Sequence, residues 1–271
     1  MNEIHIEAGR AERQYWRDLW RYRELFYFLA WRDILVRYKQ TVIGIGWAVI
    51  RPLLTMLVLT FLFHKLAKMP SNGVPYPILV FCGMLPWNFF ATAFSESGNS
   101  LVSNAGMISK VYFPRLVVPV SSVITSFVDF LISAVMLGMM MIYYKYVPGF
   151  NIIFLPFLVL LAFATAFGSG LWISALMVRY RDFRYIVPFV VQFGLYISPV
   201  GISSNVVPDE WRLLYSLNPM VGVIDGFRWA ILGENNVYWP SLYIAIGEVI
   251  FLIVTGIWYF RKTERTFADV I

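Results

Sequence analysis

Six long apolar segments, separated by short connections, are the feature that most restricts how this chain folds. A helix needs about 20 apolar residues to cross a hydrocarbon layer of about 30 Å. Segments near this length lie at residues 43–63, 76–97, 116–143, 151–178, 185–202 and 240–260. The sequence therefore predicts an all-α integral membrane protein with six transmembrane helices, organised as a single domain over residues 1–271.

The composition agrees with a membrane protein and excludes an ordinary soluble domain. Hydrophobic residues make up 59% of the 271 residues, and charged residues make up 14%. Soluble domains have about a quarter of their residues charged, because their surface must be polar. The single cysteine, Cys82, excludes an internal disulfide and a thiolate metal cluster, so we interpret it as a small buried residue.

Lysine and arginine residues set the expected orientation of the spans. They are concentrated before the first span, after the second and fourth spans, and after the last span. Basic connections are retained on the cytoplasmic side, so both termini are expected in the cytoplasm. The first forty residues are polar and arginine-rich and lack the apolar core of a cleavable signal peptide, so the first span is expected to act as its own insertion signal.

Residues 11–39 are predicted to form an amphipathic helix at the inner interface. Tyr15, Leu19 and Tyr22 share one helical face, and arginines recur on another. Two interpretations stay open for this helix. It is either a generic interfacial anchor or the flank of a lateral entrance for a lipid-borne substrate.

Residues 203–236 are predicted to form a re-entrant region in the outer leaflet. Their apolar pieces are too short to span a membrane and are interrupted by proline and glycine. We expect two short helices joined by an Asn218-Pro219 turn. Irregular backbone at that depth is tolerated where it packs on protein or lines a wet cavity.

The sequence shows no catalytic motif. It has two histidines and no Gly-Lys dipeptide, so it has no P-loop, and we expect no metal site. A membrane-embedded enzyme acting on glycans is disfavoured for the same reason. If the protein is ATP-driven, the nucleotide binds to another polypeptide.

Few charged residues fall inside the predicted spans. Arg51, Asp129 and Glu248 do so, and Glu96 lies near the inner end of the second span. Each costs about 2.5–3.5 kcal/mol at a helix centre. Asp129 is interpreted either as an inter-helix hydrogen-bonding group or as a lining residue. These carboxylates keep an ion-coupled transporter, or a flippase acting alone, as an alternative.

Several motifs, in order, resemble those of a known family. They are RDILVRYKQTVIGIGWAVIRP (32–52), ISKVYFPRLVVP (108–119), RYRDFRYIVPF (179–189), SPV (198–200) and LNPM (217–220). Together they resemble the membrane subunits of ABC exporters for bacterial cell-surface polysaccharides, namely O-antigen, capsule and wall teichoic acid. The resemblance runs through almost the whole chain. The first motif is most similar to O-antigen permeases, so O-antigen is the preferred cargo and capsule or teichoic acid the alternative.

This resemblance implies partners and a location. Two copies of the chain would form a dimer around a channel in the bacterial inner membrane, and each copy would dock onto a separate ATP-binding subunit that holds ATP and Mg²⁺. The cargo would be a glycan on an undecaprenyl diphosphate carrier, moved to the outer face. Membrane lipids are expected contacts, and nucleic acid is not an expected partner.

The resemblance also directs attention to three groups of residues. The coupling contacts with the ATPase are expected at Ser109, Lys110, Val111, Tyr112, Phe113, Pro114, Arg115, Arg179, Arg181 and Asp182. The substrate entrance and channel are expected at Trp16, Trp20, Arg32, Arg37, Tyr38, Arg51, Trp87, Phe89 and Phe90. The outer gate is expected at Asn218, Pro219 and Arg228.

The positions of Arg51 and of the aromatic run at 87–90 within predicted spans have physical consequences. Arg51 lies about 12 Å into the first span at 1.5 Å per residue, too deep for a lipid-facing charge. It is therefore expected to face the interior or the channel, paired with a carboxylate or contacting carrier phosphate. The aromatic run at 87–90 is either ordinary packing or a wall on which sugar rings stack.

Overall fold

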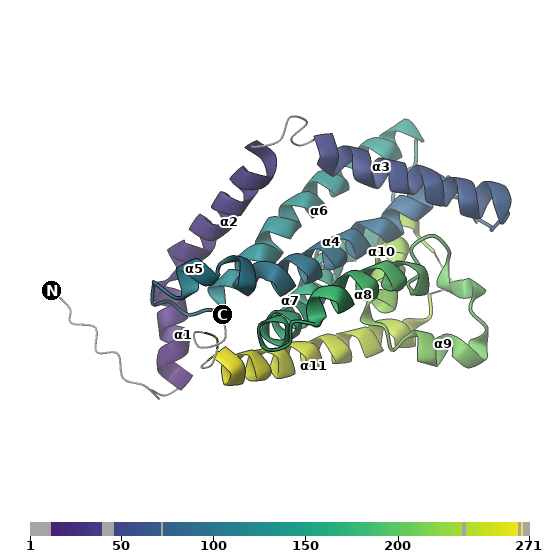
Figure 1. Cartoon of the computed structure of the whole chain (residues 1–271). Helices are drawn as coiled ribbons and strands as arrows, with labels where there is room; N and C mark the ends of the chain where they lie inside the picture. Colours follow the sequence, from purple (N-terminus) through teal and green to yellow (C-terminus); the bar gives the residue numbers. More distant parts are fainter. Residues whose placement is uncertain (1–11, 40–45, 72, 235–236, 265–266, 268–271) are drawn as a thin grey trace.

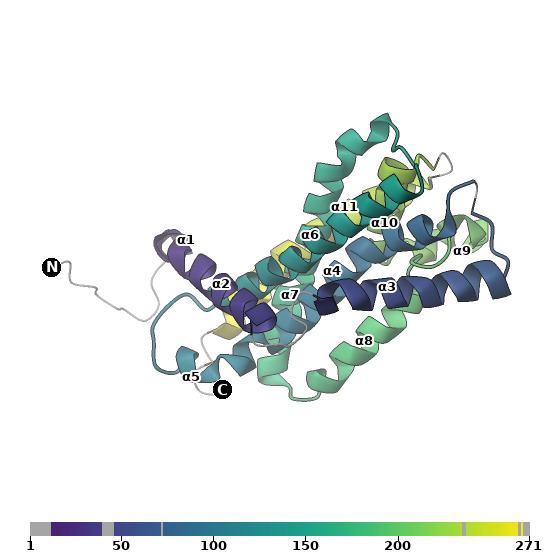
Figure 2. The same cartoon turned by 90° about the horizontal axis from the view of Figure 1, so that it is seen from above.

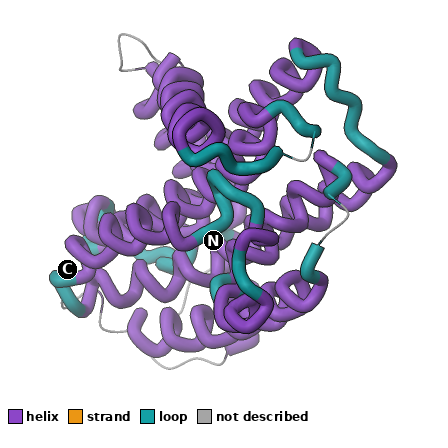
Figure 3. The backbone as a smooth tube through the Cα atoms, turned by 90° about the vertical axis from the view of Figure 1, so that its right-hand side faces the viewer, coloured by secondary structure: helices purple, strands orange, loops and turns teal. Residues whose placement is uncertain are grey.

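The chain folds as a single helical bundle. The structure is a computed structural model that describes residues 12–39, 46–71, 73–234, 237–264 and 267. Within these ranges the ordered elements are helices, with no β-strand, and the long helices pack side by side (Figures 1 and 3). The predicted all-α membrane architecture is confirmed at this level.

Five helical segments are long and apolar enough to cross a membrane. Three of them are single helices, α4 (Tyr76–Ser103), α6 (Val117–Tyr143) and α11 (Trp239–Glu264). The segment Gly46–Leu66 consists of α3 (Gly46–Thr60) followed by the π-helical turn η1 (Phe61–Leu66). The segment Phe150–Arg179 consists of the 3-10 turn η2 (Phe150–Phe154) followed by α7 (Leu155–Arg179). They correspond to five of the six predicted spans. Residues 43–45 of the first predicted span lie outside the described residues.

The fifth predicted span, over 185–202, is not confirmed as a full crossing. It forms α8 (Phe183–Ile197), whose 15 residues extend about 22 Å at 1.5 Å per residue. The helix ends because Ser198 adopts an extended backbone (φ −87°, ψ 152°) before Pro199, which disfavours a helical predecessor. Residues 198–202 are therefore an irregular loop.

The predicted amphipathic helix at 11–39 is two helices, with residue 11 outside the described residues. They are α1 (Glu12–Arg21) and α2 (Arg23–Lys39), which meet at Tyr22. The predicted apolar face, including Tyr15 and Leu19, packs on the buried cluster at the ends of α6, α7 and α11. This amphipathic pattern belongs to α1, because α2 exposes aromatic residues on the side that faces away from the bundle.

The central helix of the bundle is α4. Of its apolar stretch, 67% is buried, compared with 11% for Gly46–Leu66. It packs against α3, α6, α7, α8 and α10 (Pro219–Leu232). Figure 2 shows α3 and α8 on one flank of the bundle, where both present large exposed apolar side chains. These two helices therefore leave a large apolar surface for contacts outside the single chain.

Small residues bring α7 and α11 close together. A Cβ added at Gly256 would lie 2.8 Å from the backbone oxygen of Gly168, and one added at Gly168 would lie 3.0 Å from the backbone nitrogen of Ile253. Membrane helices associate through such small residues because lipid supplies no hydrophobic driving force between them.

The two ends of the bundle differ. The helices α1 and α5 (Ala105–Ile108) and the C-terminal end of α11 lie at one end, and α9 (Asp209–Tyr215) lies at the other (Figure 1). The region at 203–236 contains the turn η3 (Ser204–Val206), α9 and α10. The two predicted short helices are thus present on either side of Asn218-Pro219.

Candidate functional site

A cluster of charged residues joins α2 to α4 and α6. Arg37 of α2 donates through Nη2 to Glu96 Oε1 of α4 at 2.8 Å and through Nη1 to the carboxylate of Asp129 on α6. The hydroxyl of the adjacent Tyr38 donates to the other Asp129 oxygen. Burial, and next the hydrogen bond to Asp129, raise the pKa of Tyr38, so its hydroxyl remains a donor at neutral pH.

This cluster changes the interpretation of Arg37. One guanidinium is shared by two carboxylates. Its two terminal nitrogens, Nη1 and Nη2, each already donate to a carboxylate, so they are not available together to a diphosphate in this conformation. Asp129 is an inter-helix hydrogen-bonding group, which is the first of its two predicted roles. Arg37 links α2 to α4 and α6.

Arg32, one turn and a half earlier on α2, is also occupied. Its Nε donates to Asp33 Oδ1 at 2.9 Å, and its Nη2 donates to Asn104 Oδ1 at 2.9 Å. Asn104 is the C-cap residue of α4, so this contact fixes the middle of α2 on the bundle. Arg32 is therefore engaged through Nε and Nη2, although its side chain is still 39% exposed.

Arg51 remains available. It is exposed on α3, and its guanidinium lies over the Trp47 ring, 5.8 Å from the centroid. No carboxylate among the described residues lies within ion-pair distance of Arg51. The expected carboxylate partner within the chain is therefore wrong for the described residues, and two of the candidate carboxylates, Glu96 and Asp129, are paired with Arg37 instead. The alternative expectation, contact with an external phosphate, stays a prediction.

The aromatic residues predicted for the channel are divided between core and surface. Trp87 is 4% exposed and Phe89 is 3% exposed, and Phe90 is half-buried. Phe89 packs among Phe127, Phe130 and Phe163, with centroids 5.5–6.2 Å apart.

Trp87 lies against α8 at a glycine. A Cβ added at Gly194 would fall 2.4 Å from the Trp87 ring. Ordinary packing therefore accounts for Trp87 and Phe89 in this conformation, and the expectation that they line a channel is not supported. On α1, by contrast, Trp16 and Trp20 are exposed, as an entrance or an interfacial anchor requires.

The coupling segment, residues 109–115, has an exposed tip and a buried base. Ser109, Lys110, Val111 and Tyr112 are exposed, whereas Phe113 and Pro114 are buried. The backbone of Arg115 donates to Glu264 Oε1 at 2.8 Å, and its guanidinium donates to the backbone oxygen of Glu264. Arg115 therefore holds the segment to the C-terminal end of α11, and only the tip is free for a partner.

The second predicted contact region, between α7 and α8, is exposed throughout. Arg179, Arg181 and Asp182 are all exposed, and Arg179 lies over the Tyr180 ring at 5.4 Å. The backbone carbonyl of Asp182 accepts from Tyr185 N at 2.9 Å, and its side chain makes no cap. Backbone hydrogen bonds form this turn, so the Asp182 carboxylate faces outward.

The residues predicted for an outer gate fasten the loop at 198–202. Arg228 is 0% exposed and donates to Val200 O at 2.9 Å and to Ile202 O at 2.6 Å. Asn218 donates to Ser198 Oγ at 2.9 Å, and its own oxygen accepts from Met220 N at 3.1 Å, which caps α10 at Pro219.

Two further residues hold this loop and were not identified from the sequence. Tyr76 donates from its hydroxyl to Gly201 O at 2.9 Å. Gly83 leaves room for the loop, because an added Cβ would lie 2.8 Å from Val200 O and 2.9 Å from Arg228 Nη2. Both precede the loop by more than a hundred residues, so no local pattern connects them to it. Glu264 was missed for the same reason.

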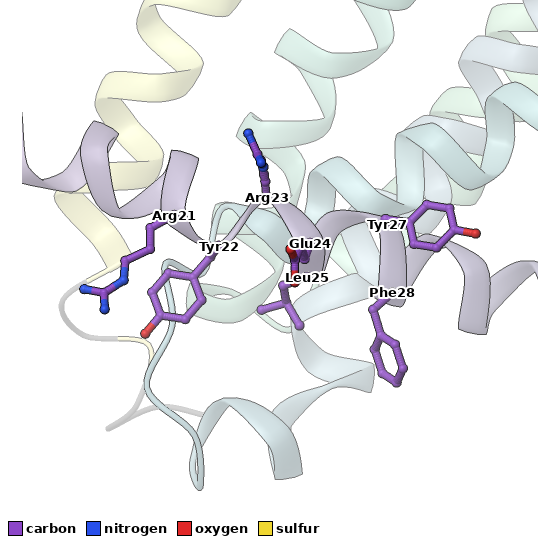
Figure 4. Close-up of a pocket in the computed structure, with 7 residues that line it drawn as sticks. All are labelled: Arg21, Tyr22, Arg23, Glu24, Leu25, Tyr27 and Phe28. Atoms are coloured by element: carbon purple, nitrogen blue, oxygen red, sulfur yellow. The ribbon is translucent and has the colours of Figure 1, made fainter. Parts of the chain in front are cut away.

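A shallow pocket of about 760 Å³ lies at the bend between α1 and α2. It is lined by Arg21, Tyr22, Arg23, Glu24, Leu25, Tyr27 and Phe28. Figure 4 shows that the side chains of Arg21 and Arg23 point away from one another. The two charges do not converge on one ligand, so we assign no site there.

Comparisons with known proteins match nearly the whole chain to transporters. A family model described as ABC-2 type transporter matches residues 24–232, which run from α2 to the end of α10. The matched region therefore contains the Arg37 cluster, Arg51, the coupling segment and Arg228.

Three bacterial transport proteins illustrate this similarity. The chain is 26% identical to the O-antigen export system permease protein RfbA of Klebsiella pneumoniae, over 89% of this chain and 92% of that protein. It is 27% identical to the protein of the same name from Myxococcus xanthus, over 94% and 98%. It is 23% identical to the polysialic acid transport protein KpsM of Escherichia coli, over 86% and 91%.

Proposed function

Since this chain belongs to the ABC-2 type transporter family, we propose that it is the membrane subunit of an ATP-driven exporter of cell-surface polysaccharide. The cargo is a polysaccharide linked to undecaprenyl diphosphate, with O-antigen as the preferred glycan. The protein moves it from the cytoplasmic to the outer face of the inner membrane. The observation that carries the proposal is similarity over about nine tenths of the chain to two O-antigen export permeases.

The proposed topology has six crossings with both termini in the cytoplasm. In it, α8 and the loop at 198–202 together form the short fifth crossing, and residues 203–236 form a re-entrant outer gate. The basic residues support this orientation, because Lys110, Arg115, Arg179 and Arg181 then all lie on the inner side with the N-terminal arginines.

Two copies of the chain and two ATP-binding subunits form the proposed complex. The exposed tip Ser109–Tyr112 and the exposed side chains of Arg179, Arg181 and Asp182 supply the contact with the ATPase. ATP and Mg²⁺ bind to that partner, and this chain contributes no cofactor site. Exposed aromatic and basic side chains beside each other are the kind of surface that protein interfaces bury.

The path of the cargo is proposed along the flank formed by α3 and α8. These helices expose the large apolar side chains that a dimer interface or a lipid-lined path requires, and Arg51 is the exposed guanidinium on α3. An arginine fork binds two phosphate oxygens at once, so Arg51 is the proposed contact for the carrier diphosphate. The deeply buried α4 contributes less to this path than the sequence suggested.

An ion-coupled transporter or a flippase acting alone is the second candidate. Asp129 would have to bind and release the ion, yet in the structure its two oxygens accept from Arg37 and Tyr38. Glu248 of α11 has a buried oxygen, Oε2, without a hydrogen-bond partner among the described residues. It is therefore the carboxylate at which ion binding would be tested.

Reconstitution separates the candidates. The chain is placed in liposomes with and without its ATP-binding subunit, and export of undecaprenyl-diphosphate-linked glycan is followed. We expect export only when both proteins and ATP are present. Transport by the chain alone, driven by an ion gradient, would overturn the proposal. Replacing O-antigen by capsule or teichoic acid precursors in the same assay identifies the cargo.

A further inference from the structure

Glu264, the last residue of α11, lies at a junction of three elements at the inner end of the bundle. Its carboxylate accepts from the backbone N–H of Arg115 at 2.8 Å, and its backbone oxygen accepts from the Arg115 guanidinium. One contact is made by the backbone of Arg115 and the other by its side chain, and Arg115 belongs to the coupling segment. A cation at the C-terminal end of a helix also interacts favourably with the helix dipole. The coupling segment is thus bonded to α11 and not only packed against it.

The third element at this junction is α1. The Arg261 guanidinium lies 4.5 Å from the centroid of the Tyr15 ring, so α1 contacts α11 one turn before Glu264. The Tyr15 hydroxyl is buried beside the Glu264 carboxylate. Burial, and next the charge of Glu264, raise the pKa of Tyr15, so the hydroxyl stays neutral at physiological pH.

Apolar packing surrounds these polar contacts and makes the junction rigid. Ile108 and Phe113 from the coupling region and Phe260 and Phe267 from the C-terminal end belong to one buried cluster. Leu19 of α1 packs against the same cluster. A displacement of the exposed tip at residues 109–112 is therefore passed to α11 and α1 through Arg115 and Glu264.

We infer that Glu264 is a positioning residue for ATP-driven transport, which keeps the coupling segment, α1 and α11 moving as one body. This inference rests on the proposed function, because the force on the segment comes from the ATP-binding subunit. Neither the motifs at the inner loops nor the charges inside the spans include Glu264. Its role is to transmit movement, and it contacts neither nucleotide nor cargo.

The test compares movement in the assembled complex of this chain with its ATP-binding subunits. Spin labels are placed by Arg17→Cys on α1 and Gly106→Cys on α5. Arg17 is exposed, a Cβ at Gly106 meets no atom within 4 Å, and the native Cys82 is buried away from label. The distance between the labels is measured by pulsed electron paramagnetic resonance without nucleotide and with trapped ATP.

We expect the label distance to be the same in both states of the otherwise native complex and to change with ATP in Glu264→Ala. Glycan exported per ATP hydrolysed should fall about tenfold in Glu264→Ala, the size expected from losing one hydrogen bond to a charged group. Glu264→Gln keeps an acceptor for the Arg115 N–H and should lose less. Glu24→Gln, which removes a carboxylate from an exposed position at the same end, is the matched control and should behave as native.

Unchanged label distances and an unchanged ratio of export to hydrolysis in Glu264→Ala would overturn the inference. If Glu264→Ala fails to assemble, Glu264→Gln and Tyr15→Phe give the same two readouts, and native behaviour of both would also overturn it. A native complex that hydrolyses ATP but exports no lipid-linked polysaccharide would contradict the proposed function instead, and the label distances would still decide the role of Glu264.

Discussion

Arg37 of α2 and Asp129 of α6, separated by 92 residues in the chain, form an ion pair that fastens the N-terminal helices to the bundle. Glu96 of α4 shares the same guanidinium at 2.8 Å, so three helices meet at one cation. The pairing gives the carboxylate in the middle of α6 a partner of opposite charge within the chain. Arg37, which holds helices together, thus differs from Arg51, which is exposed and available to a ligand.

Removing the shared cation is expected to destabilise the protein. In Arg37→Met two carboxylates lose their partner, and the free energy of unfolding should fall by about 1.5–3 kcal/mol, the range for hydrogen bonds to charged groups. Asp129→Asn should cost less, because Arg37 keeps Glu96 and the amide still accepts from Tyr38. Unfolding titrations in mixed detergent micelles measure both variants.

The same pair tests ion coupling. Because Asp129 is proposed to be structural, Asp129→Asn should retain ATP-driven export in the reconstituted complex. Abolished export with a normal rate of ATP hydrolysis would contradict this and would favour the ion-coupled alternative. Glu248→Gln, made in parallel, tests whether the other carboxylate within a span is needed for export.

Arg51 is predicted to bind the carrier and not to stabilise the fold. Arg51→Met should leave assembly and thermal stability near native, since Arg51 has no carboxylate partner among the described residues. Export should fall at least about tenfold, the effect of losing one charge-assisted contact to phosphate. Arg51→Lys should recover part of the activity, because lysine keeps the charge but loses the two-oxygen fork.

This outcome is read from export in intact cells together with the melting temperature of the purified protein. Native export by Arg51→Met would reject the carrier contact. A large loss of stability would instead place Arg51 in the architecture of the dimer. The control is Lys262→Met, which removes an exposed cation that lies 5.0 Å over the Trp258 ring on α11.

Gly83→Ala is expected to disturb the loop at 198–202. The added methyl group would lie 2.8 Å from Val200 O and 2.9 Å from Arg228 Nη2, so the loop or the guanidinium has to shift. Overpacking of this kind costs about 1–3 kcal/mol. Gly247→Ala in α11 is the matched control, because its Cβ meets nothing within 4 Å. Equal stability of the two variants, measured by thermal unfolding in detergent, would refute the close approach at Gly83.

Tyr112 and Phe113 are adjacent in the coupling segment but are expected to respond differently to alanine. Tyr112 is 65% exposed, so Tyr112→Ala should leave the chain stable and weaken binding of the ATP-binding subunit by about 2 kcal/mol, as for a central interface tyrosine. Phe113 is 5% exposed, so Phe113→Ala should lower the stability of the chain itself by about 3–5 kcal/mol. Binding assays and unfolding on the same preparations separate the two effects.

The features that the sequence predicted correctly depend on local properties. The length and apolarity of a segment lie within that segment, so five spans were found close to their observed bounds. The Asn218-Pro219 boundary was predicted because an asparagine cap and a proline in the first turn act within a few residues. The apolar face of α1, with Tyr15 and Leu19, follows from the helical period alone.

The features that the sequence did not predict depend on distant partners. Arg37, Arg51, Asp129 and Glu96 carry the same charges in any arrangement, and only the crossing of α2 over α6 decides which cation meets which carboxylate. Trp87 is buried because a glycine on α8 makes room for its ring. Glu264 ends an apolar helix in an ordinary charged tail, and its contact with Arg115 spans 149 residues of sequence.

The shortness of α8 has a consequence for the lipid around it. A helix of about 22 Å is some 8 Å shorter than a hydrocarbon layer of about 30 Å. Lipids relieve such a mismatch by thinning the bilayer beside the helix, at a fraction of a kcal/mol per Å. In the proposed topology, where α8 belongs to the fifth crossing, a bilayer thinned beside α3 and α8 would shorten the distance that a charged headgroup travels between the leaflets. The break at Ser198-Pro199 would then act on transport through the lipid as well as through the protein.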